Sequence, residues 1–213
     1  MRYRAAGFES PLPGPIAGTA NSEFVQNPIA SVSLQDFLDW EQRQTQRHEL
    51  LHGRIIPFAS TSFDHNHISD NVREALNRVL PSPCYAYGTD IIIETVSKTG
   101  ESGLRADVVV TCSKEDAGRG RYLKHPRIVV EVRSPSNSGK AWDAKLLEYW
   151  NTSSIAQLVV IETDERGAES YCRDADGVWQ PPISTIDSGV LVFPGAALEM
   201  TLDEVYRRTT LAI

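Results

Sequence analysis

Apolar residues recur every third or fourth position in three stretches of the chain, which is the period of an amphipathic α-helix. Ser33 and Thr201 each precede an acidic residue three positions on, so both are predicted to cap a helix. Pro81 and Pro83 cannot continue a helix and should end the second one. The predicted helices cover residues 34–44, 64–80, 142–150 and a segment after 201.

Short and nearly continuous apolar runs predict strands that are covered on both faces. Asp176-Gly177 is typical of a hairpin turn after a strand over 170–172. The order of helices and strands predicts an α/β (α+β) fold, with a central mixed β-sheet flanked by helices. The other predicted strands cover residues 55–58, 91–93, 108–110, 128–130, 158–161 and 190–193.

Composition divides the chain into a tail and one domain. Residues 1–30 are rich in Pro, Gly, Ala and Asn and predict a flexible tail, while residues 31–213 have the size of a single domain. No apolar run is long enough to cross a membrane, and no secretory signal is apparent, so we expect a cytoplasmic protein. The chain has 3 cysteines without a CxxC pair, which predicts packing residues rather than a disulfide or a zinc site.

The net charge of −7 argues against extensive contact with DNA phosphates. A local basic patch can nevertheless lie on an acidic protein. The segment between the strands at 108–110 and 128–130 is the best candidate for phosphate contacts, although a solvated loop explains it equally well. Its basic residues are Arg119, Arg121, Lys124, His125 and Arg127.

Two acidic residues interrupt the most apolar strands. Asp107 precedes one run of valines, and Glu131 lies between Val130 and Val132 in the next. An acid in a buried strand is costly unless it is paired or binds a cation. Two carboxylates at adjacent strands would repel each other, and Mg²⁺ or Mn²⁺ would relieve that repulsion. The alternative is that each acid is a solvated residue at a strand end.

The helix after Glu131 places a lysine near the same region. Trp142, Leu146 and Tyr149 predict its buried face, and Lys145 lies about 60° from the centre of that face. A lysine there can orient a metal-bound water or stabilise charge on a phosphate. The alternative is a surface lysine whose stem covers apolar neighbours.

The run EVRSPS is followed by a helix with the pattern K-x-x-x-Y. This combination resembles the Uma2 family (also called DUF820) of restriction-endonuclease-like proteins, and the resemblance covers roughly residues 33–205. The matching stretches are Arg47–Gly53, His65–Ile68, Gly88–Ile91, Ala106–Val109 and Val130–Ser136, with Lys145 and Tyr149.

The resemblance implies a PD-(D/E)XK nuclease fold with Asp107 and Glu131 as metal ligands. It implies Glu49 as an additional acid, and Lys145 as the replacement for the lysine that usually follows the glutamate by two residues. Further candidates are Asp90 by resemblance, His65 at a helix start, and Arg133, which cannot act as a base but can hold phosphate.

We therefore expect a Mg²⁺- or Mn²⁺-dependent deoxyribonuclease that acts on DNA, with no membrane partner and with a homodimer left open. The alternative is a catalytically degenerate nuclease fold that binds nucleic acid or protein. The negative charge favours the alternative, as do the departures from the family pattern at His52, Arg133 and Ala141. No GxSxG or HExxH motif supports a small-molecule hydrolase.

Overall fold

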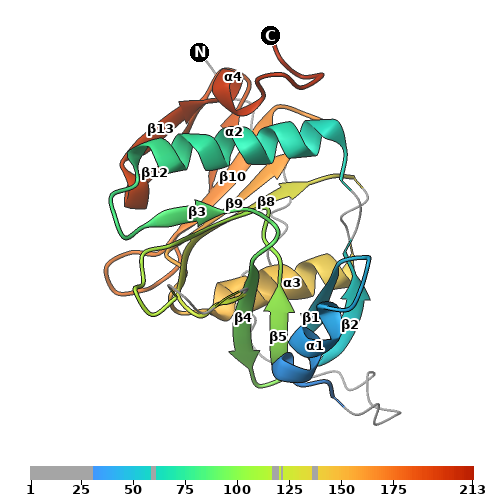
Figure 1. The fold of residues 1–213 in the computed structure, drawn as a ribbon. Helices are drawn as coiled ribbons and strands as arrows, with labels where there is room; N and C mark the ends of the chain where they lie inside the picture. Colours follow the sequence, from blue (N-terminus) through green and yellow to red (C-terminus); the bar gives the residue numbers. More distant parts are fainter. Residues whose placement is uncertain (1–30, 59–60, 117–119, 121, 136–138) are drawn as a thin grey trace.

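The computed structural model of the protein describes residues 31–58, 61–116, 120, 122–135 and 139–213 (Figure 1). The predicted tail, residues 1–30, lies outside the described residues. Ser33 and Thr201 accept hydrogen bonds from the helix-start N–H groups, so both predicted caps are confirmed. The helices are α1 (Leu34–Glu41), α2 (Phe63–Val79), α3 (Lys140–Asn151), α4 (Leu202–Val205) and the short 3-10 helix η1 (Pro194–Ala196).

A large sheet forms the centre of the molecule (Figure 1). β8 and β9 run parallel, and the other neighbouring strands are antiparallel, so the predicted mixed sheet is confirmed. In spatial order its strands are β11 (Ile183–Ile186), β10 (Gly167–Cys172), β9 (Gln157–Glu162), β8 (Pro126–Arg133), β6 (Val108–Thr111) and β3 (Tyr85–Tyr87).

Two helices cover opposite faces of the large sheet (Figure 1). Val72 of α2 packs in one core cluster with Val130 of β8, and Leu146 of α3 packs in another cluster with Val129. Because successive residues of a strand point to opposite faces, β8 contributes to both clusters and reads as a continuous apolar run. Val79, the last residue of α2, is 43% exposed.

A second, smaller sheet lies beside the large one and carries the first strands of the chain. The strand over 48–51 was not predicted, because it is short and begins with two polar residues. It pairs with its successor around the His52-Gly53 turn. In spatial order the strands of the small sheet are β2 (Arg54–Pro57), β1 (His48–Leu51), β5 (Gly100–Leu104), β4 (Ile92–Ser97) and β7 (Tyr122–Leu123).

The C-terminal part adds an antiparallel ribbon of β12 (Val190–Phe193) and β13 (Leu198–Thr201). Leu191 and Phe193 pack with α2 in the same core cluster. The predicted strand at 190–193 is therefore confirmed. Among the described residues, no helix has the length and apolarity that crossing a membrane requires.

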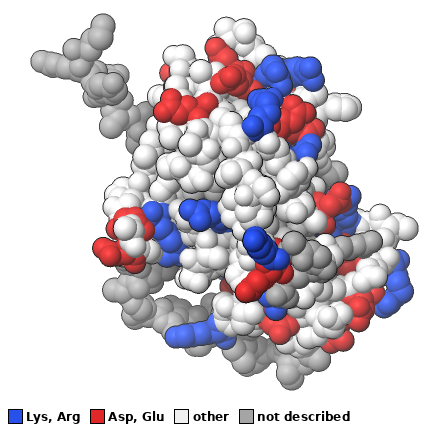
Figure 2. Space-filling model, turned by 60° about the vertical axis from the view of Figure 1, so that its left-hand side comes forward, with Lys and Arg blue, Asp and Glu red and all other residues white. Residues whose placement is uncertain are grey.

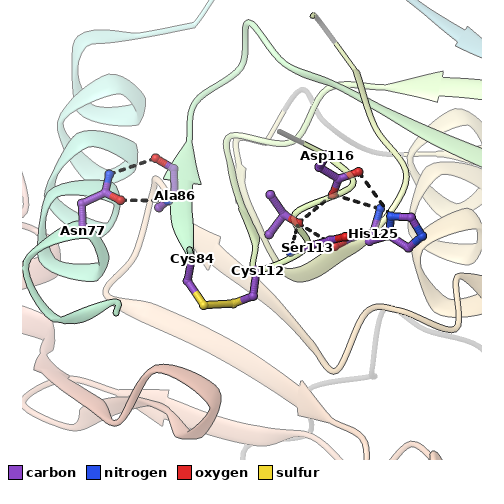
Figure 3. The surroundings of a disulfide bond; sticks show 8 residues. Asn77, Cys84, Ala86, Cys112, Ser113, Asp116 and His125 are labelled. Carbon is purple, nitrogen blue, oxygen red and sulfur yellow. Dashed lines mark hydrogen bonds and ion pairs between the residues drawn. A yellow bond between two sulfur atoms is a disulfide. The ribbon is translucent and has the colours of Figure 1, made fainter. Parts of the chain in front are cut away.

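A disulfide joins Cys84 to Cys112 at the end of the β3–β6 pair (Figure 3). Tyr85 pairs with Thr111, so the two cysteines occupy the next pair of opposite positions. The spacing of the cysteines predicts unlinked packing residues, and this prediction is wrong, because strand pairing joins residues 28 positions apart. On the other edge of β3, the side-chain amide of Asn77 both donates to and accepts from the backbone of Ala86.

Candidate functional site

Strand pairing brings Asp107 and Glu131 together. β6 and β8 are antiparallel, and Val108 pairs with Val130, so Asp107 and Glu131 fall on the next pair of opposite positions. Opposite side chains in an antiparallel pair have Cβ atoms about 5 Å apart. Asp107 is 4% exposed and Glu131 is 3% exposed. Two buried carboxyl groups therefore meet at the end of the β6–β8 pair.

Each carboxylate oxygen of Asp107 has its own partner. Nε2 of His65, in the first turn of α2, lies 2.8 Å from Oδ1. The backbone N–H of Val132 donates to Oδ2 at 2.7 Å. His65 is itself buried, so the structure places this candidate against the carboxylate of Asp107, where it fixes the orientation of that group.

Glu131 is held from α3 by two side chains. The hydroxyl of Tyr149 donates to Oε1 at 2.9 Å, and Nζ of Lys145 donates to Oε2 at 3.1 Å. Burial raises the pKa of Glu131 from 4.5 to about 8; the charge of Lys145 opposes this rise, and the charges of Asp107 and Glu49 add to it. The folded protein therefore favours a bound proton, or another positive charge, at Glu131.

Lys145 reaches into the cluster rather than into solvent. Its Nζ lies 3.0 Å from Oε1 of Glu131 and 3.0 Å from Oε1 of Glu49, and it donates to the backbone oxygen of Arg105 at 2.8 Å. Burial alone lowers the pKa of Lys145, but the negative charges of Glu131, Glu49 and Asp107 outweigh burial and raise it. Lys145 is therefore an ammonium group shared between two carboxyl groups.

Arg105 ties the small sheet to the cluster. Its backbone N–H donates to Oε1 of Glu49 at 2.7 Å, while its guanidinium pairs with Glu41 at 3.0 Å and donates to the backbone oxygen of His48 at 3.0 Å. Glu49 lies on β1 and Arg105 just after β5. The structure thus brings Glu49 to the predicted cluster through the pairing of two strands of the small sheet.

The sequence pattern did not reveal Arg105 or the hydroxyl contact of Tyr149. A signal was available for the arginine, because Arg105 stands between Leu104 and Ala106 immediately before a buried strand. A charged residue in such a setting is expected to have a specific partner. The tyrosine is marked by the K-x-x-x-Y pattern of the family resemblance, although its spacing alone is explained by the buried face of α3.

The cluster has more negative than positive groups, which bears on whether it can hold a metal. Glu49 and Glu131 contact the ammonium group of Lys145, and the negative charge of Asp107 acts on it as well. Within the part of the chain that the structure describes, no group of three or more His, Cys, Asp or Glu side chains surrounds a possible metal position. Mg²⁺, however, is commonly held by one or two carboxylates with several waters.

The donor chemistry of Asp107 and Glu131 fits such a two-carboxylate site, because both groups are buried and Glu131 favours a positive partner. Glu49 is engaged by Lys145 and by the backbone of Arg105. Both of these contacts are made by Oε1 of Glu49.

Two further candidates lie outside the cluster. Asp90 is 75% exposed at its side chain and forms an ion pair with Arg47. Arg133 makes two contacts with Glu162, at 2.9 Å through Nε and at 2.6 Å through a terminal nitrogen. In this structure Arg133 is therefore occupied by a carboxylate, and Asp90 is a surface residue.

The predicted basic group is only partly described, because Arg119 and Arg121 lie outside the described residues. Lys124 lies 2.9 Å from Oε2 of Glu94. Arg127 is exposed at the start of β8, at the end of that strand away from Glu131. The described partner of Lys124 is thus outside the carboxyl cluster, and a role of this group in phosphate binding stays a prediction.

A pocket of about 300 Å³ opens beside the cluster. Asp107 and His65 line it on the side of the cluster, and Phe58, Arg47 and Arg73 line it elsewhere. Through this pocket, solvent can reach Asp107.

Comparisons with known proteins agree with this fold. Residues 34–202 match the family model Uma2, described as "Putative restriction endonuclease". The "Uncharacterized protein slr1290" of Synechocystis sp. (strain ATCC 27184 / PCC 6803 / Kazusa) is 25% identical over 181 residues, which are 84% of this chain and 94% of the relative. The "Uncharacterized protein sll1609" of the same strain is 25% identical over 149 residues, or 68% of this chain and 82% of the relative.

A solved structure is also similar. It is described as a "putative nuclease belonging to DUF820 from Anabaena variabilis ATCC 29413", with a TM-score of 0.66 and 16% identity. The match covers 82% of this chain and 97% of that chain. At this identity the likeness shows a shared fold, and it confirms the predicted mixed α and β architecture.

Proposed function

The chain belongs to the Uma2 family, and we propose from this membership that it is a metal-dependent nuclease that hydrolyses phosphodiester bonds in DNA. The observation that carries the proposal is the buried set of Glu49, Asp107 and Glu131 around Lys145. Buried carboxylates in excess of their positive partners are costly unless a cation or a proton joins them. The nuclease description of the similar fold from Anabaena variabilis supports the same class of activity.

The chemistry follows from the roles of the side chains. Mg²⁺ or Mn²⁺ at Asp107 and Glu131 would supply Lewis-acid polarisation of the phosphate and a more acidic water. His65 and the Val132 N–H orient Asp107, and Tyr149 orients Glu131. Lys145 contributes a fixed positive charge that stabilises the charge developing on the phosphate.

A second candidate function is a binding module with a nuclease fold that no longer cleaves. The contacts of Lys145 with both Glu49 and Glu131 favour it, because the ammonium group already satisfies part of the negative charge without a metal. A module of this kind need not take up Mn²⁺, whereas the nuclease must. Metal uptake therefore separates the two candidates.

Cleavage of supercoiled plasmid by the purified full chain tests the proposal. With Mn²⁺ we expect nicked and linear DNA, and with EDTA none. Asp107→Asn should lose the activity, while Asp187→Asn, an equally conservative change at an exposed residue, should keep it. Cleavage that persists equally in EDTA or in Asp107→Asn would contradict the proposal. Lack of cleavage together with no Mn²⁺-dependent rise in melting temperature would favour the binding module.

The proposed location is the cytoplasm, and the proposed partner is DNA, with a homodimer still a prediction. The Cys84–Cys112 disulfide is the observation that weighs against the cytoplasm, where such bonds are uncommon. Trapping thiols at the moment of cell lysis would report the oxidation state of the two cysteines and so test the location.

A further inference from the structure

The reactive groups of the proposed nuclease are recessed rather than presented on a convex surface. Asp107, Glu131 and Glu49 are 4%, 3% and 6% exposed, and Lys145 is 8% exposed. A phosphate must therefore move inward past the surrounding side chains to come within contact distance of these groups. The pocket of about 300 Å³ that Asp107 and His65 line provides such a route.

The walls of this pocket combine an aromatic ring with positive charge. Phe58 lines the pocket, and Nζ of Lys145 lies 5.9 Å from the centre of its ring. Arg47 and Arg73 line the pocket as well, and each also pairs with an exposed aspartate, Asp90 and Asp70 respectively. A ring beside paired arginines suits a base and its phosphate, because bases stack on aromatic side chains and arginine binds phosphate.

A second pocket, of about 720 Å³, begins on the other side of Arg47. Arg47 lines both pockets, so they are neighbours across this side chain. The second pocket is lined by the aromatic ring of Tyr122 and by glutamine side chains, whose amides can both donate to and accept from base edges. These glutamines are Gln35, Gln42, Gln44 and Gln46.

The net charge of the protein argues against an extended contact with double-stranded DNA. A protein that neutralises about 6–10 phosphates of a double helix needs a broad basic surface, and this chain has a net charge of −7. On the face shown in Figure 2, basic and acidic side chains alternate instead of gathering by sign. Recognition by stacking and by amide hydrogen bonds requires far fewer positive charges.

Building on the proposed function, we propose that the substrate is a single strand, or an unpaired segment of a duplex, with one nucleotide seated in the pocket between Phe58 and Asp107. The flanking nucleotides pass Arg47 into the second pocket. The first pocket has the volume of a small ligand site, about 300–1,000 Å³. A double helix is too large to enter a pocket of this volume. An unpaired nucleotide avoids the cost of extrusion from a stack.

Labelled oligonucleotides of one sequence, single-stranded or annealed to their complement, test this inference. Fluorescence anisotropy with the Glu131→Gln protein measures binding without cleavage, and the wild type with Mn²⁺ measures cleavage. We expect about tenfold tighter binding and faster cleavage of the single strand. Phe58→Ala should weaken binding of the single strand by about tenfold, as expected for one lost stacking contact.

Phe63→Ala is the matched control, because Phe63 is 86% exposed at the start of α2 and does not line either pocket. Arg47→Ala is a second variant, and because Arg47 is half-exposed its loss leaves the core intact. This variant should weaken both the binding of the single strand and the dependence of that binding on salt.

The possible outcomes separate the single-strand inference from the proposed nuclease function. Equal or tighter binding of the duplex, or equal effects of Phe58→Ala and Phe63→Ala, would overturn the single-strand inference and leave the nuclease proposal intact. Selective single-strand binding without cleavage of either form would support the inference and refute the nuclease. Absence of binding to both forms would overturn the inference.

Discussion

Lys145 contacts both carboxylate oxygens of Glu131, with Nζ 3.0 Å from Oε1 and 3.1 Å from Oε2. The same nitrogen lies 3.0 Å from Oε1 of Glu49, so one ammonium group separates two buried carboxyl groups. The protonation states of such closely spaced groups depend on one another. Changing any of the three residues therefore alters the charge balance of the whole cluster.

Replacing Lys145 by Met should lower the free energy of unfolding of the metal-free protein by about 3–5 kcal/mol, because buried carboxylates lose their positive partner. Mn²⁺ should recover more stability in this variant than it adds to the wild type. Thermal unfolding in EDTA and in Mn²⁺ measures both effects. Lys98→Met is the control at an exposed lysine and should change little. Unchanged stability of Lys145→Met would show that its ion pairs contribute nothing.

The same Lys145→Met variant should cleave DNA about 10²-fold more slowly than the wild type, which is the effect of losing one charge-stabilising group. The loss should be incomplete, because Asp107 and Glu131 remain to hold the cation. Single-turnover rates with saturating Mn²⁺ measure it. A rate equal to that of the wild type would assign Lys145 a purely structural role.

Replacing Glu131 by Gln should abolish cleavage and make the metal-free protein more stable near neutral pH. The raised pKa, about 8, means that the folded wild type keeps a proton that its unfolded state loses, and glutamine avoids this cost. Plasmid cleavage tests the expected loss of activity, and urea unfolding tests the expected effect on stability. Glu199→Gln is the matched change at an exposed strand residue. A strong loss of stability in Glu131→Gln alone would mean that the charged carboxylate holds the fold together.

Stability of the metal-free protein should fall as the pH rises through the window set by Glu131. Burial raises the pKa of this carboxyl group from 4.5 to about 8. Between these values the folded state binds a proton that the unfolded state has lost, so the contribution is full below the lower value and is lost on passing the upper one. Urea unfolding from about pH 5 to about pH 9 in EDTA should give a steeper decline for wild type than for Glu131→Gln. Parallel curves would contradict the raised pKa.

The disulfide should stabilise the fold by about 3–4 kcal/mol, the loop-closure estimate for a separation of 28 residues. Cys84→Ser with Cys112→Ser should reproduce the effect of dithiothreitol on the urea midpoint, and the reductant should then have no further effect on the variant. Cys172→Ser changes the unlinked cysteine and serves as the control. A reductant effect that persists in the double variant would place the sensitivity elsewhere.

Sequence patterns predicted those parts of the site that lie within one element. Asp107 and Glu131 were visible because each interrupts an apolar strand, and Lys145 because the helical period placed it beside a buried face. The partners of Arg105 and the Cys84–Cys112 bond depend on which strands pair and in what register. The hydroxyl contact of Tyr149 depends on how α3 packs on the large sheet. That information comes from the packing of distant segments, so no local pattern carries it.

The cluster is assembled from both sheets, since Glu49 lies on β1 of the small sheet and Glu131 on β8 of the large one. The chain passes from one sheet to the other several times between these two residues. A cut at the midpoint of the 213-residue chain therefore leaves Glu49 in one half and Asp107, Glu131 and Lys145 in the other. Recombination that exchanged one half of the gene with that of a distant relative would have to preserve the packing of the small sheet against the large one. The site is therefore inherited as a whole or lost.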